Sequence, residues 1–134
     1  MAGKSTFLSN KLLDYQFGGT VYALPANFYI ELYTAAPTDA GGGTPVGAGG
    51  AYARAAVTND AANFPNAVGG SKSNAAAITF AQATAPWGTV VAFGIFDALV
   101  GGNLLYWALL TTPITIPTGG TFSFATGQLV ITED

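Results

Sequence analysis

Cysteine and histidine do not occur anywhere in the 134-residue sequence. The absence of cysteine excludes a disulfide framework and a thiolate zinc site. Without either residue, a catalytic nucleophile would have to be a serine or threonine with a lysine base, or the chemistry would need a pair of carboxylates. No such arrangement stands out, so we expect no catalytic residue, no cofactor and no metal site.

The acidic residues that such chemistry would need have ordinary structural interpretations. Glu31 and Asp97 lie in predicted strands and could meet in space. Asp97, however, directly precedes a turn, where a carboxylate commonly accepts hydrogen bonds from turn amides. Asp39 and Asp60 lie in predicted loops without the spacing of metal ligands. The sequence therefore favours a protein that is not an enzyme.

Charged residues are scarce, at 8% of the chain, and the seven acidic residues outnumber the four basic ones. The net charge of −3 gives no electrostatic footprint for nucleic acid. Half of the residues are hydrophobic, but the longest apolar run, Leu104 to Leu110, is far below the ~18 residues of a membrane-spanning helix. We expect neither nucleic acid nor a membrane as partner, and an oligomer or a docked subunit explains the hydrophobicity better. Met1 to Thr6 lacks an apolar signal core, which predicts synthesis and retention in the cytoplasm.

The chain is long enough for one domain with a real core, so we expect a single β domain over residues 1–134. Its centre is predicted to be a hairpin of Trp87–Asp97 and Leu104–Leu110, joined by a turn over residues 98–103. Val, Ile, Phe, Tyr and Trp dominate both runs, which favours strands. Both strands are apolar on both faces, so a second sheet, a helix or another copy of the protein must cover each side.

The only convincing helix is predicted over residues 5–17, with Ser5 or Thr6 as its N-cap. Leu8, Leu12 and Tyr15 recur on one face, and Gly18-Gly19 ends the helix. We expect this apolar face to cover the domain's own sheet. The alternative is an arm that reaches a neighbouring subunit.

The remaining strands are short and separated by turn signals. Phe28–Tyr33 alternates cleanly, so that Tyr29, Glu31 and Tyr33 share a face that we expect at the sheet surface, although an interface or a sugar platform would also fit. Ile114–Ile116 lies between two prolines, which suits an edge strand. Residues 35–51 and 59–76 are predicted as long loops. About eight short strands with one N-terminal helix predict a mainly β protein, an antiparallel β-sandwich of jelly-roll-like or immunoglobulin-like topology.

Exposed aromatic residues are the remaining functional candidates. Trp87, which follows Pro86, could anchor a protein interface or stack on a sugar, as could several tyrosines. Core packing is the alternative interpretation, and we favour it for Trp107 because that residue lies in the middle of an apolar strand.

Several segments resemble a family of short tailed-phage proteins known as phage tail fibre proteins. The similarity covers almost the whole chain in order, and it is carried by residues 8–14, 25–38, 50–54, 87–90, 93–97, 101–106 and 127–132. This resemblance implies a non-enzymatic component of a bacteriophage virion, made in the host cytoplasm. Long fibres usually have repeats or an extended shaft, whereas this chain is predicted to be one compact domain.

We therefore expect a capsid decoration, or cement, protein that binds the major capsid protein lattice on the capsid surface and stabilises the head. Decoration proteins that it resembles commonly assemble as trimers, which implies a homotrimer. The alternative is a tail fibre or tail-tip module, bound to tail proteins, that contacts a host receptor through exposed aromatics such as Trp87 or Tyr33. The candidate interface residues are Phe7, Leu8, Leu12, Pro37, Pro45 and Trp87.

Overall fold

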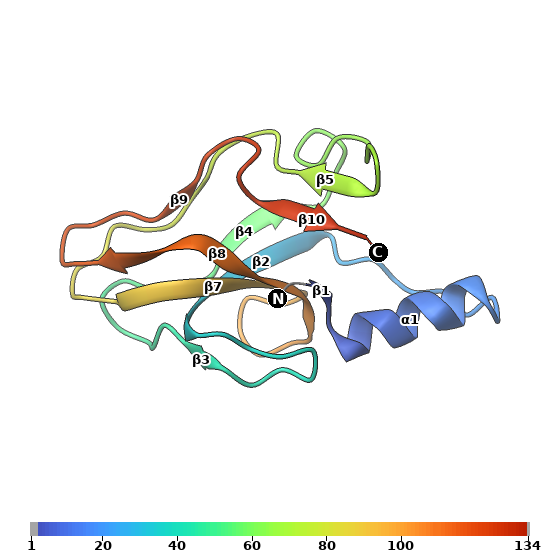
Figure 1. The fold of residues 1–134 in the computed structure, drawn as a ribbon, viewed down its shortest axis with the longest axis horizontal. Coiled ribbons are helices and arrows are strands. Elements are labelled where there is room, and N and C mark those ends of the chain that lie inside the picture. The colour runs from blue at the N-terminus through green and yellow to red at the C-terminus, as the bar shows by residue number, and fades with distance from the viewer. Residues whose placement is uncertain (1–2, 134) are drawn as a thin grey trace.

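The computed structural model describes residues 3–133 and contains one helix and ten strands in that range. The largest sheet has the strand order β1-β8-β7-β2-β3, and β4 also pairs with β2 (Figure 1). The strand pairs of this sheet are antiparallel. The bounds of its strands are β1 Gly3–Lys4, β2 Asn27–Ala35, β3 Thr44–Pro45, β4 Ala55–Thr58, β7 Gly88–Phe96 and β8 Leu104–Ile116.

Two small sheets form the second layer of the sandwich. One pairs β5 (Ser71–Ser73) with β10 (Val130–Thr132), and the other pairs β6 (Ile78–Thr79) with β9 (Ser123–Phe124). In Figure 1 they lie above the main sheet. A single cluster of buried side chains from both layers forms the core. The prediction of an antiparallel β-sandwich with one N-terminal helix is confirmed, and the innermost core residues are Ile30, Leu32, Val90 and Leu129.

The central hairpin is confirmed as β7 and β8, but β8 is longer than predicted. It runs on through Pro113, so the predicted edge strand at 114–116 is the end of β8 and not a separate element. The pairing shifts between Val90, opposite Ile114, and Ala92, opposite Leu109. Pro113 therefore lies in a bulge, where its missing N–H removes no regular ladder bond.

Two short strands, β3 and β5, lie within the segments predicted as long loops. The loop around β3 is closely packed, because a Cβ on Gly43 would lie 2.8 Å from the backbone oxygen of Ala35. Gly43 also has a φ of +76°, which side-chain-bearing residues rarely adopt. Residues 20–24 form no strand.

The helix α1 spans Thr6–Gln16, and Ser5 is its N-cap as predicted. The Ser5 hydroxyl accepts a hydrogen bond from the backbone N–H of Leu8 at 3.1 Å, which satisfies one of the free donors of the first turn. No residue of α1 is buried, and Figure 1 shows it extending away from the sheets. The expectation that α1 covers its own sheet is therefore wrong, although its start packs against β1 and β8.

The outer face of the main sheet is covered instead by loops. Trp107, predicted to be a core residue, is 6% exposed. Its indole N–H donates a hydrogen bond of 2.9 Å to Oδ1 of Asp39. Glu31 and Tyr33, expected at the sheet surface, are 7% and 3% exposed. That expectation is wrong because the segment around Asp39 and the turn after β7 lie over this face.

Candidate interaction surface

A buried ion pair fixes the β7–β8 turn to the main sheet. The guanidinium of Arg54 lies 3.3 Å from the Glu31 carboxylate, and both side chains are about nine-tenths buried. Arg54 also donates hydrogen bonds to the backbone oxygens of Ala98 at 2.7 Å and Gly101 at 2.8 Å. A buried charge needs this kind of pairing to offset its lost hydration. The turn is therefore held in one place relative to β2.

Tyr52 completes this network from the segment that leads into β4. Its hydroxyl donates to the Glu31 carboxylate and accepts a 2.9 Å hydrogen bond from the backbone N–H of Leu32. Burial, followed by the hydrogen bond to Glu31, raises the pKa of Tyr52 well above its ordinary value. The Tyr52 hydroxyl consequently stays protonated and structural over the physiological range.

Asp97 and Asp60 have the structural roles expected of turn carboxylates. Asp97 accepts hydrogen bonds from the backbone and side-chain amides of Asn103 at 2.7 and 2.9 Å, as predicted for a residue that precedes the turn. Asp60 accepts from the backbone N–H of Asn63 at 2.8 Å. No group of three acidic side chains within residues 3–133 is placed to hold a metal ion.

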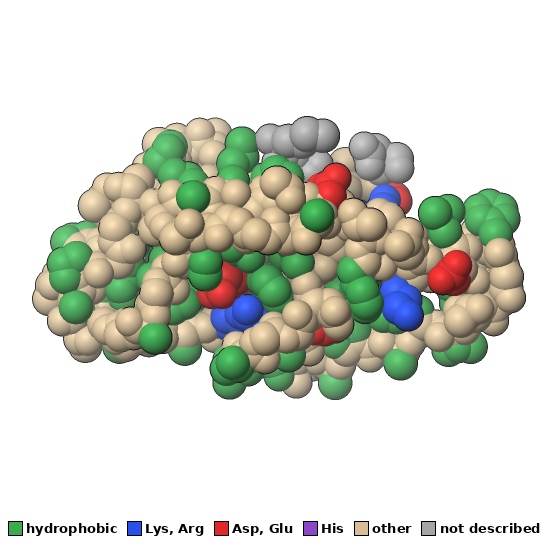
Figure 2. Space-filling view, turned by 90° about the horizontal axis from the view of Figure 1, so that it is seen from below, with side chains coloured by type: hydrophobic (Ala, Val, Ile, Leu, Met, Phe, Trp, Pro, Cys, Tyr) green, Lys and Arg blue, Asp and Glu red, His purple; other side chains and the backbone are tan. Residues whose placement is uncertain are grey.

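The most exposed apolar segment is the one that we call the arm: α1 together with residues 17–26. Phe17, Val21 and Leu24 are 79%, 81% and 72% exposed. Leu13 and Tyr15 on α1 are more than half exposed as well. Figure 2 shows hydrophobic side chains at the right-hand end of the molecule, where α1 lies, with few charged groups among them. An isolated helix of this length is marginal in water, which makes the arm the candidate interaction surface of the described residues.

An apolar groove lies where the arm meets the body. It has a volume of about 190 Å³. An ion pair between Lys4 and Glu133 stands at its rim. Its walls are formed by the arm and by residues of β2, β7, β8 and β10. The apolar side chains that line it are Leu8, Leu12, Tyr22, Leu24, Phe28, Ile95, Leu105 and Ile131.

The accessible surface of the chain agrees with a projecting arm. It is 7157 Å², whereas a compact monomer of this mass exposes about 6,600 Å². The difference of about 560 Å² is total surface, polar and apolar together, and it is in the direction expected of a chain with a projecting segment.

The predicted interface residues differ in how far the structure exposes them. Phe7, Leu8 and Leu12 are half-buried on the inner side of the arm, and Pro45 is exposed in β3. Pro37 is buried. Trp87 is 6% exposed and donates its indole N–H to the backbone oxygen of Gly50 at 2.9 Å.

The expectation that Trp87 and Tyr33 are exposed for receptor contact is therefore wrong. Sequence reasoning also passed over Phe17, Val21 and Leu24, which are the most exposed apolar residues of the arm. One feature of the sequence could have identified them: these apolar residues flank Gly18-Gly19 and belong to no strand or helix pattern that would place them in the core.

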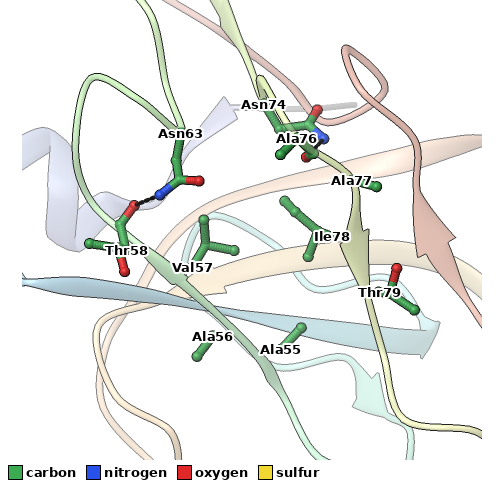
Figure 3. A pocket seen from close by; sticks show the side chains of 10 residues that line it. All are labelled: Ala55, Ala56, Val57, Thr58, Asn63, Asn74, Ala76, Ala77, Ile78 and Thr79. Atoms are coloured by element: carbon green, nitrogen blue, oxygen red, sulfur yellow. Dashed lines mark hydrogen bonds between the residues drawn. The ribbon is translucent and has the colours of Figure 1, made fainter.

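A second hollow, of about 400 Å³, lies between β4 and β6 and is lined mainly by small side chains (Figure 3). The polar groups on its wall are already used. Asn63 donates to the backbone oxygen of Thr58 at 3.1 Å. Asn74 donates to Ala76 and Ala125 and accepts from the backbone N–H of Leu129. This hollow therefore presents few free hydrogen-bonding side chains.

The helix of the described part has 11 residues and is too short to cross a membrane.

The search of curated proteins found no match to the chain. A family model described as "Podophage GP4 fiber I protein gp80" matches residues 3–132. This match spans the helix, both layers of the sandwich and the turns between them. The chain belongs to this family of phage virion structural proteins.

Proposed function

We propose that this protein is a structural subunit of the fibre apparatus of a phage virion. The observation that carries the proposal is the family match over residues 3–132, whose description names a podophage fibre protein. The fold agrees with a structural role, because its buried charged groups hold turns and strands together. In this proposal the protein is located on the tail and contacts other tail proteins.

Assembly proceeds through the arm, which packs against a second copy of the chain. The arm is apolar and nearly uncharged, with only Lys11 and Asp14 as charged residues. The adjoining groove is equally apolar. A chain that carries both an exposed apolar arm and an apolar groove can bury one against the other between copies. A homotrimer is the oligomer that the family resemblance favours.

Capsid decoration is the second candidate function. It is supported by the compact sandwich, which has neither a sequence repeat nor an extended shaft within residues 3–133. In that case the arm would bind the major capsid protein at the capsid surface, and each copy would add interface area across capsomer seams.

The two functions are separated by a phage that lacks this protein. A fibre subunit predicts particles that adsorb poorly to the host but release their DNA at the normal temperature. A decoration protein predicts normal adsorption and DNA release at a lower temperature. Normal adsorption would contradict the fibre proposal, and the same phage complemented with the intact gene is the control.

A further inference from the structure

A hollow of about 250 Å³ lies between β8 and β9, on one side of the sandwich. Three buried core residues, Phe93, Phe122 and Phe124, border it. Leu110 of β8 and several exposed side chains of both strands complete the lining, and none of these side chains is charged. The core phenylalanines therefore border a space that no side chain of residues 3–133 fills.

The stretch of β8 beside this hollow has an unpaired backbone. β1 pairs with β8 at Trp107 and Tyr106, and the pairing with β7 passes from Leu109 directly to Ile114. Residues 110–112 thus have no partner strand in the described part of the chain, and none of its other backbone hydrogen bonds involves them. A strand with free N–H and C=O groups is a template on which a second strand can pair.

This edge lacks the charged side chains that commonly protect an exposed strand. Lysine or another charge on an edge strand prevents pairing with a second chain. The sequence contains no charged residue between Asp97 and Glu133, which includes all of β8 and β9. Pro113 has no N–H to donate and so limits pairing to the residues before it. The edge can therefore accept a short, uncharged, extended segment.

The arm contains a segment with these properties. Residues 20–24 have the sequence Thr-Val-Tyr-Ala-Leu, rich in residues that favour strands, and no charged residue occurs between Asp14 and Glu31. They form no strand, and the backbone of residues 21–24 takes part in no hydrogen bond within residues 3–133. Val21 is exposed, whereas Tyr22 beside it is half-buried. The segment is thus a strand-forming sequence without a strand partner.

We infer that residues 20–24 of one copy pair with residues 110–112 of a second copy as an added β-strand, with Val21 in the hollow against Phe93. The inference rests on the proposed assembly through the arm and adds the surface that receives it. Figure 1 places α1 and the end of β8 at opposite ends of the molecule, so the contact joins two copies. Because it uses different surfaces on the two copies, it is heterologous and can close into a ring such as a trimer.

Disulfide cross-linking tests the contact directly, because the chain has no cysteine of its own. Full-length Val21→Cys is mixed with full-length Thr112→Cys and oxidised mildly, and peptide mass spectrometry identifies the linked positions. A disulfide between positions 21 and 112 is expected. Val100→Cys replaces Thr112→Cys in the control, because Val100 is 85% exposed but lies outside the hollow. Equal linkage to positions 100 and 112, or no linkage to position 112, would overturn the inference.

A charge on the receiving edge separates this inference from the assembly on which it rests. Thr112→Lys should weaken association at least about tenfold, because pairing would bury an unpaired charge, as measured by light scattering after size exclusion. Thr118→Lys is the control, since Thr118 is exposed beyond the hollow. If Val21→Ser weakens association but Thr112→Lys does not, assembly through the arm stands and the β8 edge is excluded as its receiver. The edge would then be open to a strand from a different protein.

Discussion

The guanidinium of Arg54 stacks on the ring of Phe96, with its central carbon 3.8 Å from the ring centre. The same group contacts the Glu31 carboxylate and two backbone oxygens of the β7–β8 turn. One side chain therefore links strand β2, the end of β7 and the turn that follows it. The sequence has four basic residues, and Arg54 is the one whose charged group is held in a buried ion pair.

Replacing Arg54 should destabilise the fold strongly. Arg54→Met keeps an apolar stem but leaves Glu31 as an unpaired buried charge, which costs about 3–5 kcal/mol. Urea unfolding followed by tryptophan fluorescence measures the change. Lys72→Met is the control, because Lys72 is exposed and its hydrogen bond to the backbone oxygen of Phe64 is long, at 3.3 Å. Equal stability of the two variants would show that the Arg54 contacts contribute little.

Two adjacent glycines of the same turn allow a matched comparison. Gly101 and Gly102 both have positive φ, at +67° and +73°. A Cβ on Gly101 would meet nothing within 4 Å, whereas a Cβ on Gly102 would lie 2.5 Å from Oδ1 of Asp97. Gly101→Ala should cost about 1–2 kcal/mol from backbone strain alone. Gly102→Ala should cost a further ~1–3 kcal/mol for the clash, and thermal unfolding that ranks them in the opposite order would refute the geometry of the turn.

High pH should destabilise the protein through Tyr33. Burial, followed by the nearby Glu31 charge, raises the pKa of Tyr33 from 10.0 to about 12. In the unfolded chain the phenol ionises near pH 10, so between pH 10 and 12 the folded form holds more protons. The free energy of unfolding should therefore be unaffected by Tyr33 below pH 10 and should fall as the pH rises to 12.

Urea midpoints measured across this pH window, with phenolate absorbance at 295 nm, provide the measurement. In Tyr33→Phe the free energy of unfolding should depend less on pH in this window. Part of the dependence should remain, because the pKa of Tyr52 is also raised. An unchanged slope in Tyr33→Phe would mean that the phenol is not buried as described.

The arm should control the oligomeric state. Phe17→Ser with Val21→Ser removes two of its most exposed apolar side chains, and light scattering after size exclusion should then report a monomer. Val68→Ser with Val100→Ser is the control, because these residues are equally exposed at 81% and 85% but lie outside the arm. The control should remain oligomeric. Identical masses for both variants would place the subunit contact elsewhere.

The elements that the sequence predicts well are those with strong local signals. The β7–β8 hairpin follows from two long runs of β-branched and aromatic residues. The start of α1 follows from Ser5, whose hydroxyl caps the first turn. In these places the local preference and the tertiary structure agree, so no knowledge of distant contacts is needed.

The elements that the sequence does not predict depend on distant partners. β3 and β5 have two and three residues and exist only because β2 and β10 offer free edges. Glu31 and Tyr33 lie on a strand face that looks half-polar, but loops far along the chain bury it. The hydrogen bond between Asp39 and Trp107 has the same origin, since the two residues are 68 positions apart and meet only in the fold.

The central claim is that the chain is a fibre subunit of a phage virion. The most direct measurement is its copy number per purified virion, by quantitative mass spectrometry against the major capsid protein. The fibre account predicts a small fixed number of copies, set by the symmetry of the tail. A simple lattice ratio to the major capsid protein, such as one to one, would contradict it and would assign the protein to the capsid surface.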